Sequence, residues 1–374
     1  MFWKEIRKFW INGLQKFRLP RKLGFLAAFC LAGLWGCRGE TGPEFGLLWG
    51  NRGYVTADGE NLGNLAGAAQ VEEFCRKMEA GEAAGMTLAV LSKDTVSNRE
   101  AFTKYECRTR GKKAEVKECY FTREGQAKGG GFKEQSRVEY EAGFWEYTDG
   151  YLFFGPAYMS GYDGPSGCTA LRVEPLEKEC LEWSRRYLRP TGYGKNNLFL
   201  EDWDEEDYGK IDFSDLFDAW YPFVYQRPFP YPADENCNVG AVYRIPAEEF
   251  EAVIQSHLSI DRETLREKAG YFPENPTYEY RPRGLYDCHQ TDLFPEVTAG
   301  RENKDGTITL TVRAVDPGEH KAAAFTHETV VRPLDNGGFQ YVSNRVLSRE
   351  EPADPSWYKA RLTEEEWEEI YGEP

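Results

Sequence analysis

Histidine is scarce in this sequence, and the motifs that organise many enzymes are missing from it. Four histidines occur among 374 residues, namely His257, His289, His320 and His327. His327 and Glu328 begin like the zinc-binding pattern HExxH, but Val331 stands where the second histidine would be. The sequence also lacks a GxSxG nucleophile turn, a Walker loop and a dinucleotide-binding glycine fingerprint. We therefore predict no cofactor and no catalytic residue, and we favour a protein that is not an enzyme.

Positively charged residues are outnumbered by negatively charged ones. The chain has 46 Lys and Arg against 62 Asp and Glu, a net charge of −16. A nucleic-acid partner requires a basic surface that neutralises phosphates, so this balance argues against one. Apolar residues make up 41% and aromatic residues 15% of the chain, enough to form hydrophobic cores. The length favours two domains.

No hydrophobic run is long enough to span a membrane, but the first 36 residues resemble an export signal. Residues 1–22 hold seven Lys and Arg against the single acid Glu5, and residues 23–35 contain no charge. Such a run of thirteen residues fits the apolar part of a signal peptide, whereas a membrane span needs about 20. It ends in Leu34-Trp35-Gly36-Cys37, which resembles the bacterial lipobox. An uncleaved N-terminal anchor is the alternative.

These features predict a signal peptide over residues 1–36, a lipid on Cys37 and a tether over residues 37–60. Removal of the signal would leave 39 basic and 61 acidic residues, a net charge of −22. An anionic membrane surface repels such a body, so a covalent lipid has to hold it there. Two acyl chains give stable anchoring. We expect a lipid-anchored protein on the extracytoplasmic face of the cell membrane, with the membrane as its one assigned partner.

The remaining cysteines give no metal site. Seven are left: Cys75, Cys107, Cys119, Cys168, Cys180, Cys237 and Cys288. They include no CxxC pair, which a zinc site would favour. We expect each to be a small buried apolar residue, although one or two disulfides are compatible with an exported protein. Their spacing does not determine any pairing.

Acidic residues crowd into residues 201–218, where nine acids accompany the single base Lys210. Asp202, Asp204 and Asp207 are the candidate cation ligands, but the glycine of an EF-hand loop is absent there. We favour a solvated loop, with Asp212 and Asp215 capping a helix, and we predict no metal.

The patterns along the chain predict an α+β protein. An N-terminal β-rich domain is expected over residues 61–200, with helices at 67–80 and 175–188. A C-terminal domain is expected over residues 201–346 and should fold as an isolated fragment. It would contain helices at 213–220, 247–258 and 262–269, and a four-stranded antiparallel meander at 296–302, 307–315, 324–333 and 339–346. An acidic tail, residues 347–374, would carry a short helix at 364–371 with a capping box.

The C-terminal half contains five long and specific runs: NNLFLEDWDEEDYGKIDFSDLFDAWYP (196–222), VYRIPAEEFEAVIQSHLSIDRETLREKAGY (242–271), YEYRPRGLYD (278–287), DGTITLTVRAVDP (305–317) and AFTHETVVRPLDNGGFQYVSNRV (324–346). These runs are similar to a family of uncharacterised lipoproteins of Gram-positive anaerobes. The resemblance is best over residues 170–346. It implies location and architecture only, because that family has no established activity.

The favoured hypothesis is a non-catalytic binding or interaction protein of the cell envelope. Tyr221, Tyr225 and Tyr231 are candidate ligand-binding residues, since flat rings in a proline-rich loop can stack on sugar or peptide. Packing of these rings between the two domains is the interpretation we prefer. An extracellular hydrolase that uses paired carboxylates is the alternative function. A transporter-linked solute-binding protein is less favoured, because it requires alternating strands and helices.

Overall fold

The computed structural model describes six stretches of the chain: residues 53–123, 131–157, 167–232, 241–283, 293–349 and 358–371. The expected signal peptide, Cys37, Cys237 and Cys288 lie outside these residues. The predicted α+β class is confirmed. No helix in the described stretches is both long and apolar enough to cross a membrane.

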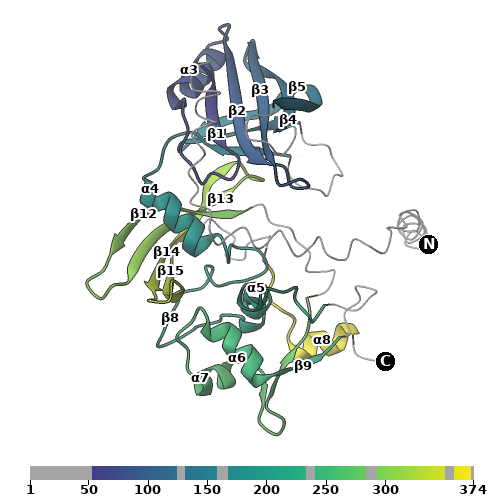
Figure 1. Ribbon diagram of the computed structural model, residues 1–374, viewed down its shortest axis with the longest axis vertical. Coiled ribbons are helices and arrows are strands. Elements are labelled where there is room, and N and C mark those ends of the chain that lie inside the picture. The colour runs from purple at the N-terminus through teal and green to yellow at the C-terminus, as the bar shows by residue number, and fades with distance from the viewer. Residues whose placement is uncertain are drawn as a thin grey trace, which may run out of the picture.

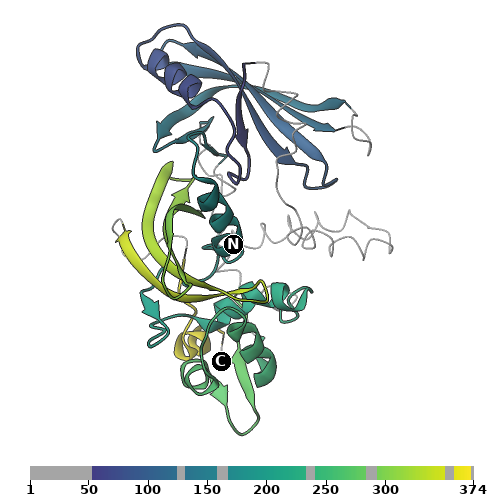
Figure 2. The ribbon, with the colours of Figure 1, turned by 60° about the vertical axis from the view of Figure 1, so that its left-hand side comes forward.

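The chain forms two units that follow one another along the long axis of the molecule (Figure 1). The N-terminal unit contains β1 (Val55–Asp58), α3 (Ala68–Glu79), β2 (Gly85–Lys93), β3 (Glu100–Arg110), β4 (Lys113–Arg123), β5 (Phe132–Thr148), β6 (Tyr151–Pro156) and β7 (Thr169–Arg172). The seven strands pair in chain order, β1 with β2 in parallel and the others antiparallel. Helix α3 lies against this twisted sheet (Figure 2).

Helix α3 packs on the sheet through one apolar side. Val71, Phe74 and Met78 recur at helical spacing, and all three are buried in the core of the N-terminal unit. The side chain of Asn61 joins the first strand region to the last. Its Nδ2 donates to the Ala170 carbonyl at 3.2 Å and its Oδ1 accepts from the Arg172 backbone N–H at 2.7 Å. The Asn61 side chain thus takes the place of the backbone hydrogen bonds that a neighbouring strand would make.

The C-terminal unit contains two sheets and most of the helices. Its elements are α4 (Lys178–Trp183), the π-helical turn η2 (Ser184–Leu188), β8 (Trp203–Asp204), α5 (Phe213–Tyr225), β9 (Tyr243–Pro246), α6 (Ala247–Gln255), α7 (Arg262–Lys268), β10 (Tyr271–Phe272), β11 (Thr277–Tyr280), β12 (Phe294–Glu302), β13 (Ile308–Asp316), β14 (Lys321–Pro333), β15 (Phe339–Arg349) and α8 (Glu364–Tyr371). Strands β12 to β15 pair in chain order, and β8 adds a fifth strand beside β15 that the sequence did not predict. A second sheet, in the order β10-β11-β9, was also not predicted.

Helix α4 packs across β12, where a glycine makes room for it. A Cβ atom at Gly300 would lie 2.3 Å from Cζ3 of Trp183, so any larger residue would displace the indole ring. The close approach brings residues 180–200 onto the C-terminal sheet. Tyr187, Leu188 and Tyr193 are buried in the same apolar cluster as Trp220 and Leu310. The division between the two cores therefore lies between Val173 and Cys180, earlier than the predicted boundary at residues 200 and 201.

The described cysteines are mostly buried, as predicted. Cys107, Cys119 and Cys180 are 1 to 3% exposed, and Cys75 accepts a hydrogen bond from the Trp145 indole at 3.2 Å. These four are free thiols. Burial raises the pKa of the Cys107 thiol to about 12, so this thiol stays protonated and apolar in character.

Candidate functional site

The three candidate cation ligands hold a loop together through hydrogen bonds to the protein. Asp202 Oδ1 accepts from the Val346 backbone N–H at 2.7 Å, and Asp204 Oδ1 accepts from two backbone N–H groups of its own turn. Asp207 Oδ1 accepts from the next turn and from Lys268 Nζ at 3.3 Å. No group of three or more potential metal ligands occurs among the described residues. The three carboxylates thus accept hydrogen bonds from the protein, mostly within the turns of the acidic loop itself.

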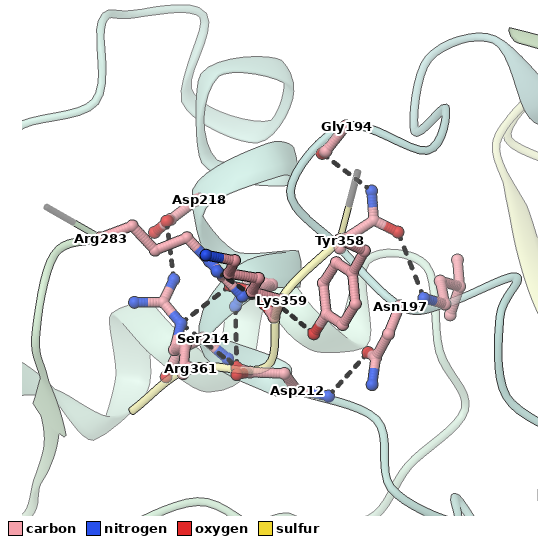
Figure 3. Close-up of polar contacts among 12 residues, drawn as sticks. Gly194, Asn197, Asp212, Ser214, Asp218, Arg283, Tyr358, Lys359 and Arg361 are labelled. Atoms are coloured by element: carbon pink, nitrogen blue, oxygen red, sulfur yellow. Dashed lines mark hydrogen bonds and ion pairs between the residues drawn. The ribbon is translucent and has the colours of Figure 1, made fainter. Parts of the chain in front are cut away.

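The second half of the acidic segment is neutralised by arginines from distant parts of the chain (Figure 3). Asp212 caps α5 by accepting from the N–H groups of Ser214 and Asp215, which confirms its predicted role. Asp215 has a different role from the cap predicted for it. Its buried carboxylate accepts two hydrogen bonds from Arg283, both 2.7 Å long, and one from Arg361 at 2.8 Å. The acids at this end of α5 therefore bind the chain segments that carry Arg283 and Arg361 to the helix.

The segment anchored there is residues 358–361, which we name the C-terminal strap. Tyr358 donates its hydroxyl to Asp215 Oδ2 at 3.1 Å, and Arg361 reaches both Asp215 and Asp218. Arg283 donates in turn to the Lys359 carbonyl at 2.9 Å. These residues were expected to belong to an acidic tail, whereas the structure binds them to the body through α5.

Asp218 is the one acid of this cluster with a strongly shifted pKa. Burial raises the pKa of its carboxyl to about 6, and the Arg361 guanidinium opposes that shift. Its Oδ1 is buried and has no hydrogen-bond partner. A carboxyl of this kind can act as a general acid. Here, however, Arg361 forms ion pairs with both Asp215 and Asp218, so the two carboxylates belong to an internal network of charges.

The three candidate tyrosines come together within the C-terminal unit. Tyr221 and Tyr225 lie on α5, which continues through Pro222 beyond its predicted end, and their ring centroids are 4.7 Å apart. The ring centroid of Tyr231 lies 6.4 Å from that of Tyr221, and the Tyr231 hydroxyl donates a hydrogen bond to Glu249 Oε2 at 3.2 Å. Tyr221 is fully buried, so its ring is not available to a ligand. The preferred prediction, packing between the two domains, is wrong because these rings belong to the C-terminal core.

A buried histidine network lies deeper in the same unit. His327 has no exposed surface, and its Nε2 is 2.9 Å from the Tyr193 hydroxyl. Its Nδ1 lies 2.7 Å from Asn344 Oδ1, which can only accept, so Nδ1 carries the proton. Burial lowers the pKa of His327 to about 3. A neutral histidine sealed from solvent supports the sheet and cannot meet a substrate.

The two units are joined by a buried ion pair that the sequence did not reveal. Glu296 on β12 accepts from Arg172 Nε at 3.0 Å, from Arg172 Nη2 and from the Tyr151 hydroxyl at 2.6 Å. Arg172 also donates to the Asp149 carbonyl at 2.7 Å. The side chains of Arg172 and Glu296 are only 5% and 4% exposed. Burial of an ion pair requires this complete set of partners.

A hollow of about 260 Å³ opens beside this ion pair, and we name it the junction pocket. Its lining residues are Asp149, Arg172, Glu174, Pro175, Leu176, Thr298 and Arg313. They come from both units and include both signs of charge. A second hollow of about 530 Å³ is more open and lies beside the acidic loop, next to Asp202 and Lys210. Ligand sites favour the space between domains, so the junction pocket is the candidate site.

Comparison with known protein families matches residues 46–361 to a family of unknown function, DUF6070. The chain belongs to the DUF6070 family. No curated protein and no solved structure matches it.

The DUF6070 match covers both units of the fold. Every residue of the junction pocket lies within it, and its last residue is Arg361 of the C-terminal strap. The strap is therefore part of the DUF6070 region. The predicted resemblance to an uncharacterised family is confirmed at this level, while the lipoprotein character and the bacterial origin stay predictions.

Proposed function

We propose that this DUF6070 protein is a lipid-anchored binding protein of the cell envelope, attached to the extracytoplasmic face of the membrane through Cys37. The observation that carries the proposal is the order of its N-terminal residues. A basic stretch, an uncharged apolar run and Leu34-Trp35-Gly36-Cys37 follow one another. That order is typical of a bacterial lipoprotein signal.

The charge of the body supports a covalent anchor. A net charge of −22 after residue 36 would keep the folded units away from anionic lipid headgroups. Two acyl chains supply the membrane affinity that such a surface cannot. The folded units would then lie at the end of a tether, accessible to envelope ligands such as a protein or a glycan.

A binding role is favoured over hydrolysis by the state of the carboxylates. The alternative hydrolase would need two acids that face a substrate across an open cleft. Asp215 and Asp218, of which Asp218 has a raised pKa, are both held by Arg361 instead. The junction pocket, in contrast, offers charged groups to a small ligand.

Labelling with palmitate in a bacterial host tests the anchor. Wild-type protein should incorporate the label, and Cys37→Ala should lose it and accumulate as unprocessed precursor. Cys30→Ala is the matched control, because Cys30 lies in the apolar run and should leave labelling intact. Absence of label from the wild type, or its persistence in Cys37→Ala, would show that the proposal is wrong.

A further inference from the structure

Three arginines gather at the junction of an otherwise acidic protein. Arg172 is paired with Glu296, whereas Arg189 lies 4.8 Å from the Phe294 ring centroid with its buried Nε lacking a hydrogen-bond partner. Arg313 stands directly opposite Glu296 in the β12–β13 register. Both oxygens of Glu296 are already used by Arg172 and Tyr151. Glu296 thus lies among the three arginines, and Arg189 is also close enough to Asp58 and Glu60 for electrostatic attraction.

Arg313 is the arginine that is free to meet a ligand. It lines the junction pocket and is partly exposed. Within the described part of the chain, its guanidinium has no hydrogen-bond or ion-pair partner. A guanidinium group presents paired N–H donors that match the two oxygens of a carboxylate. The hydroxyl of Thr298 lies on the neighbouring strand and belongs to the same wall. It makes only a long hydrogen bond, 3.5 Å, to the Thr311 carbonyl, so it can turn to donate to a ligand instead.

The pocket also offers negative charge. Asp149 and Glu174 are exposed residues of its lining, and neither side chain has an ion-pair partner among the residues that the structure describes. Pro175 and Leu176 add an apolar surface beside them. A phosphate dianion would be repelled by the two carboxylates, and a simple cation by the arginines. A ligand that carries a negative group, a positive group and a small apolar part complements the arginine, the carboxylates and the apolar surface of the lining.

We propose that the junction pocket binds a free α-amino acid, with its carboxylate on Arg313 and Thr298 and its ammonium group toward Glu174 and Asp149. The volume of about 260 Å³ suits a ligand of that size, since drug-sized ligands occupy about 300–1,000 Å³. This inference rests on the proposed binding role and deepens it by naming a ligand class. It is independent of the lipid on Cys37.

Bound ligand would also join the two units. Asp149 and Glu174 precede α4, while Thr298 and Arg313 belong to the C-terminal sheet. An amino acid that contacts both sets stabilises their observed arrangement, because a ligand that binds only the folded form shifts unfolding to higher temperature.

Calorimetric titration of the soluble chain from residue 38 with each common L-amino acid tests the proposal. At least one should bind with a Kd below about 1 mM, and its N-acetyl and carboxamide forms should each bind at least about tenfold more weakly. Arg313→Gln and Glu174→Gln should each weaken binding by about the same factor. Glu174 is exposed, so its variant keeps the test valid if Arg313→Gln folds poorly.

Arg301→Gln is the matched control, because Arg301 is an exposed arginine at the far end of β12. It should bind the amino acid as the wild type does. The proposal is overturned if no amino acid binds, if Arg313→Gln binds unchanged, or if inorganic phosphate binds more tightly than any amino acid. Palmitate labelling is unaffected by these results, so failure of the ligand class and failure of the anchor remain distinguishable.

Discussion

The Asp215→Asn substitution should destabilise the C-terminal unit strongly, although it preserves the shape of the side chain. The Asp215 carboxylate is fully buried and accepts hydrogen bonds from Arg283, Arg361 and Tyr358. Asparagine removes the negative charge and turns one end of the side chain into a donor that faces other donors. Arg283, 6% exposed, then loses the carboxylate charge of Asp215, and Arg361, 14% exposed, keeps only its contacts with Asp218 and Asp212.

The size of the effect follows from burial. Removal of one partner from a buried ion pair costs about 3–5 kcal/mol, a large part of the roughly 5–15 kcal/mol that holds a typical domain folded. An exposed pair contributes about 0–1 kcal/mol. Glu328→Gln is therefore the matched control, since Glu328 pairs with Arg345 on the surface of the same unit, at 29% and 65% exposure.

Urea unfolding followed by circular dichroism measures both variants against the wild type. Asp215→Asn should lower the midpoint of the C-terminal transition far more than Glu328→Gln does. A double variant with Arg361→Met should cost less than the sum of the two single variants, because both remove the same interaction. If Asp215→Asn differs from the wild type by less than about 1 kcal/mol, the anchoring role of this carboxylate is refuted.

Two further predictions concern pH and calcium. Because the folded His327 pKa of about 3 lies below its ordinary value, its stability contribution is complete above about pH 6.5 and falls toward pH 3, by at most about 5 kcal/mol. The Asp218 carboxyl, with a pKa raised to about 6, makes the free energy of unfolding depend on pH in the opposite direction. The measurement is therefore the difference between wild type and His327→Gln in the slope of the unfolding free energy against pH. Equal slopes would contradict the prediction. Calcium and chelator should leave the melting temperature unchanged, since Asp204 and Asp207 already accept hydrogen bonds within the protein. A rise of several degrees in millimolar calcium that Asp204→Asn with Asp207→Asn abolishes would show a cation site.

Elements with a local signal could be predicted from the sequence. The helix expected at 67–80 forms at Ala68–Glu79, and Asp261 caps α7 by accepting from the Thr264 N–H at 2.9 Å. The capping box at Thr363 and Glu366 is also formed. Helix α5 was expected to end near Trp220, because proline normally breaks a helix. Burial of Tyr221 and partial burial of Tyr225 in the core extend it through Pro222 to Tyr225.

The charged clusters could not be predicted, because their partners are far apart in the sequence. Asp215 meets Arg283 and Arg361 from 68 and 146 residues away, and Arg172 meets Glu296 across 124. No periodicity or spacing encodes such a pair, since only the tertiary fold brings its members together. The junction pocket was missed for the same reason: its arginines lie on strands whose local pattern indicates only burial.

The last prediction concerns the division between the units and uses two fragments. Residues 201–346 were expected to fold alone, but that fragment lacks Cys180 and six large buried residues of the C-terminal core: Tyr187, Leu188, Tyr193, Leu198, Phe199 and Leu200. Burial of each contributes about 1.5–3 kcal/mol, so their loss removes roughly 10 kcal/mol, comparable to the whole stability of a domain. Residues 174–371 keep them and the strap, and should show dispersed amide resonances and cooperative unfolding, whereas 201–346 should show neither. A well-dispersed spectrum of 201–346 would place residues 180–200 outside the cooperative unit, despite their burial in its core.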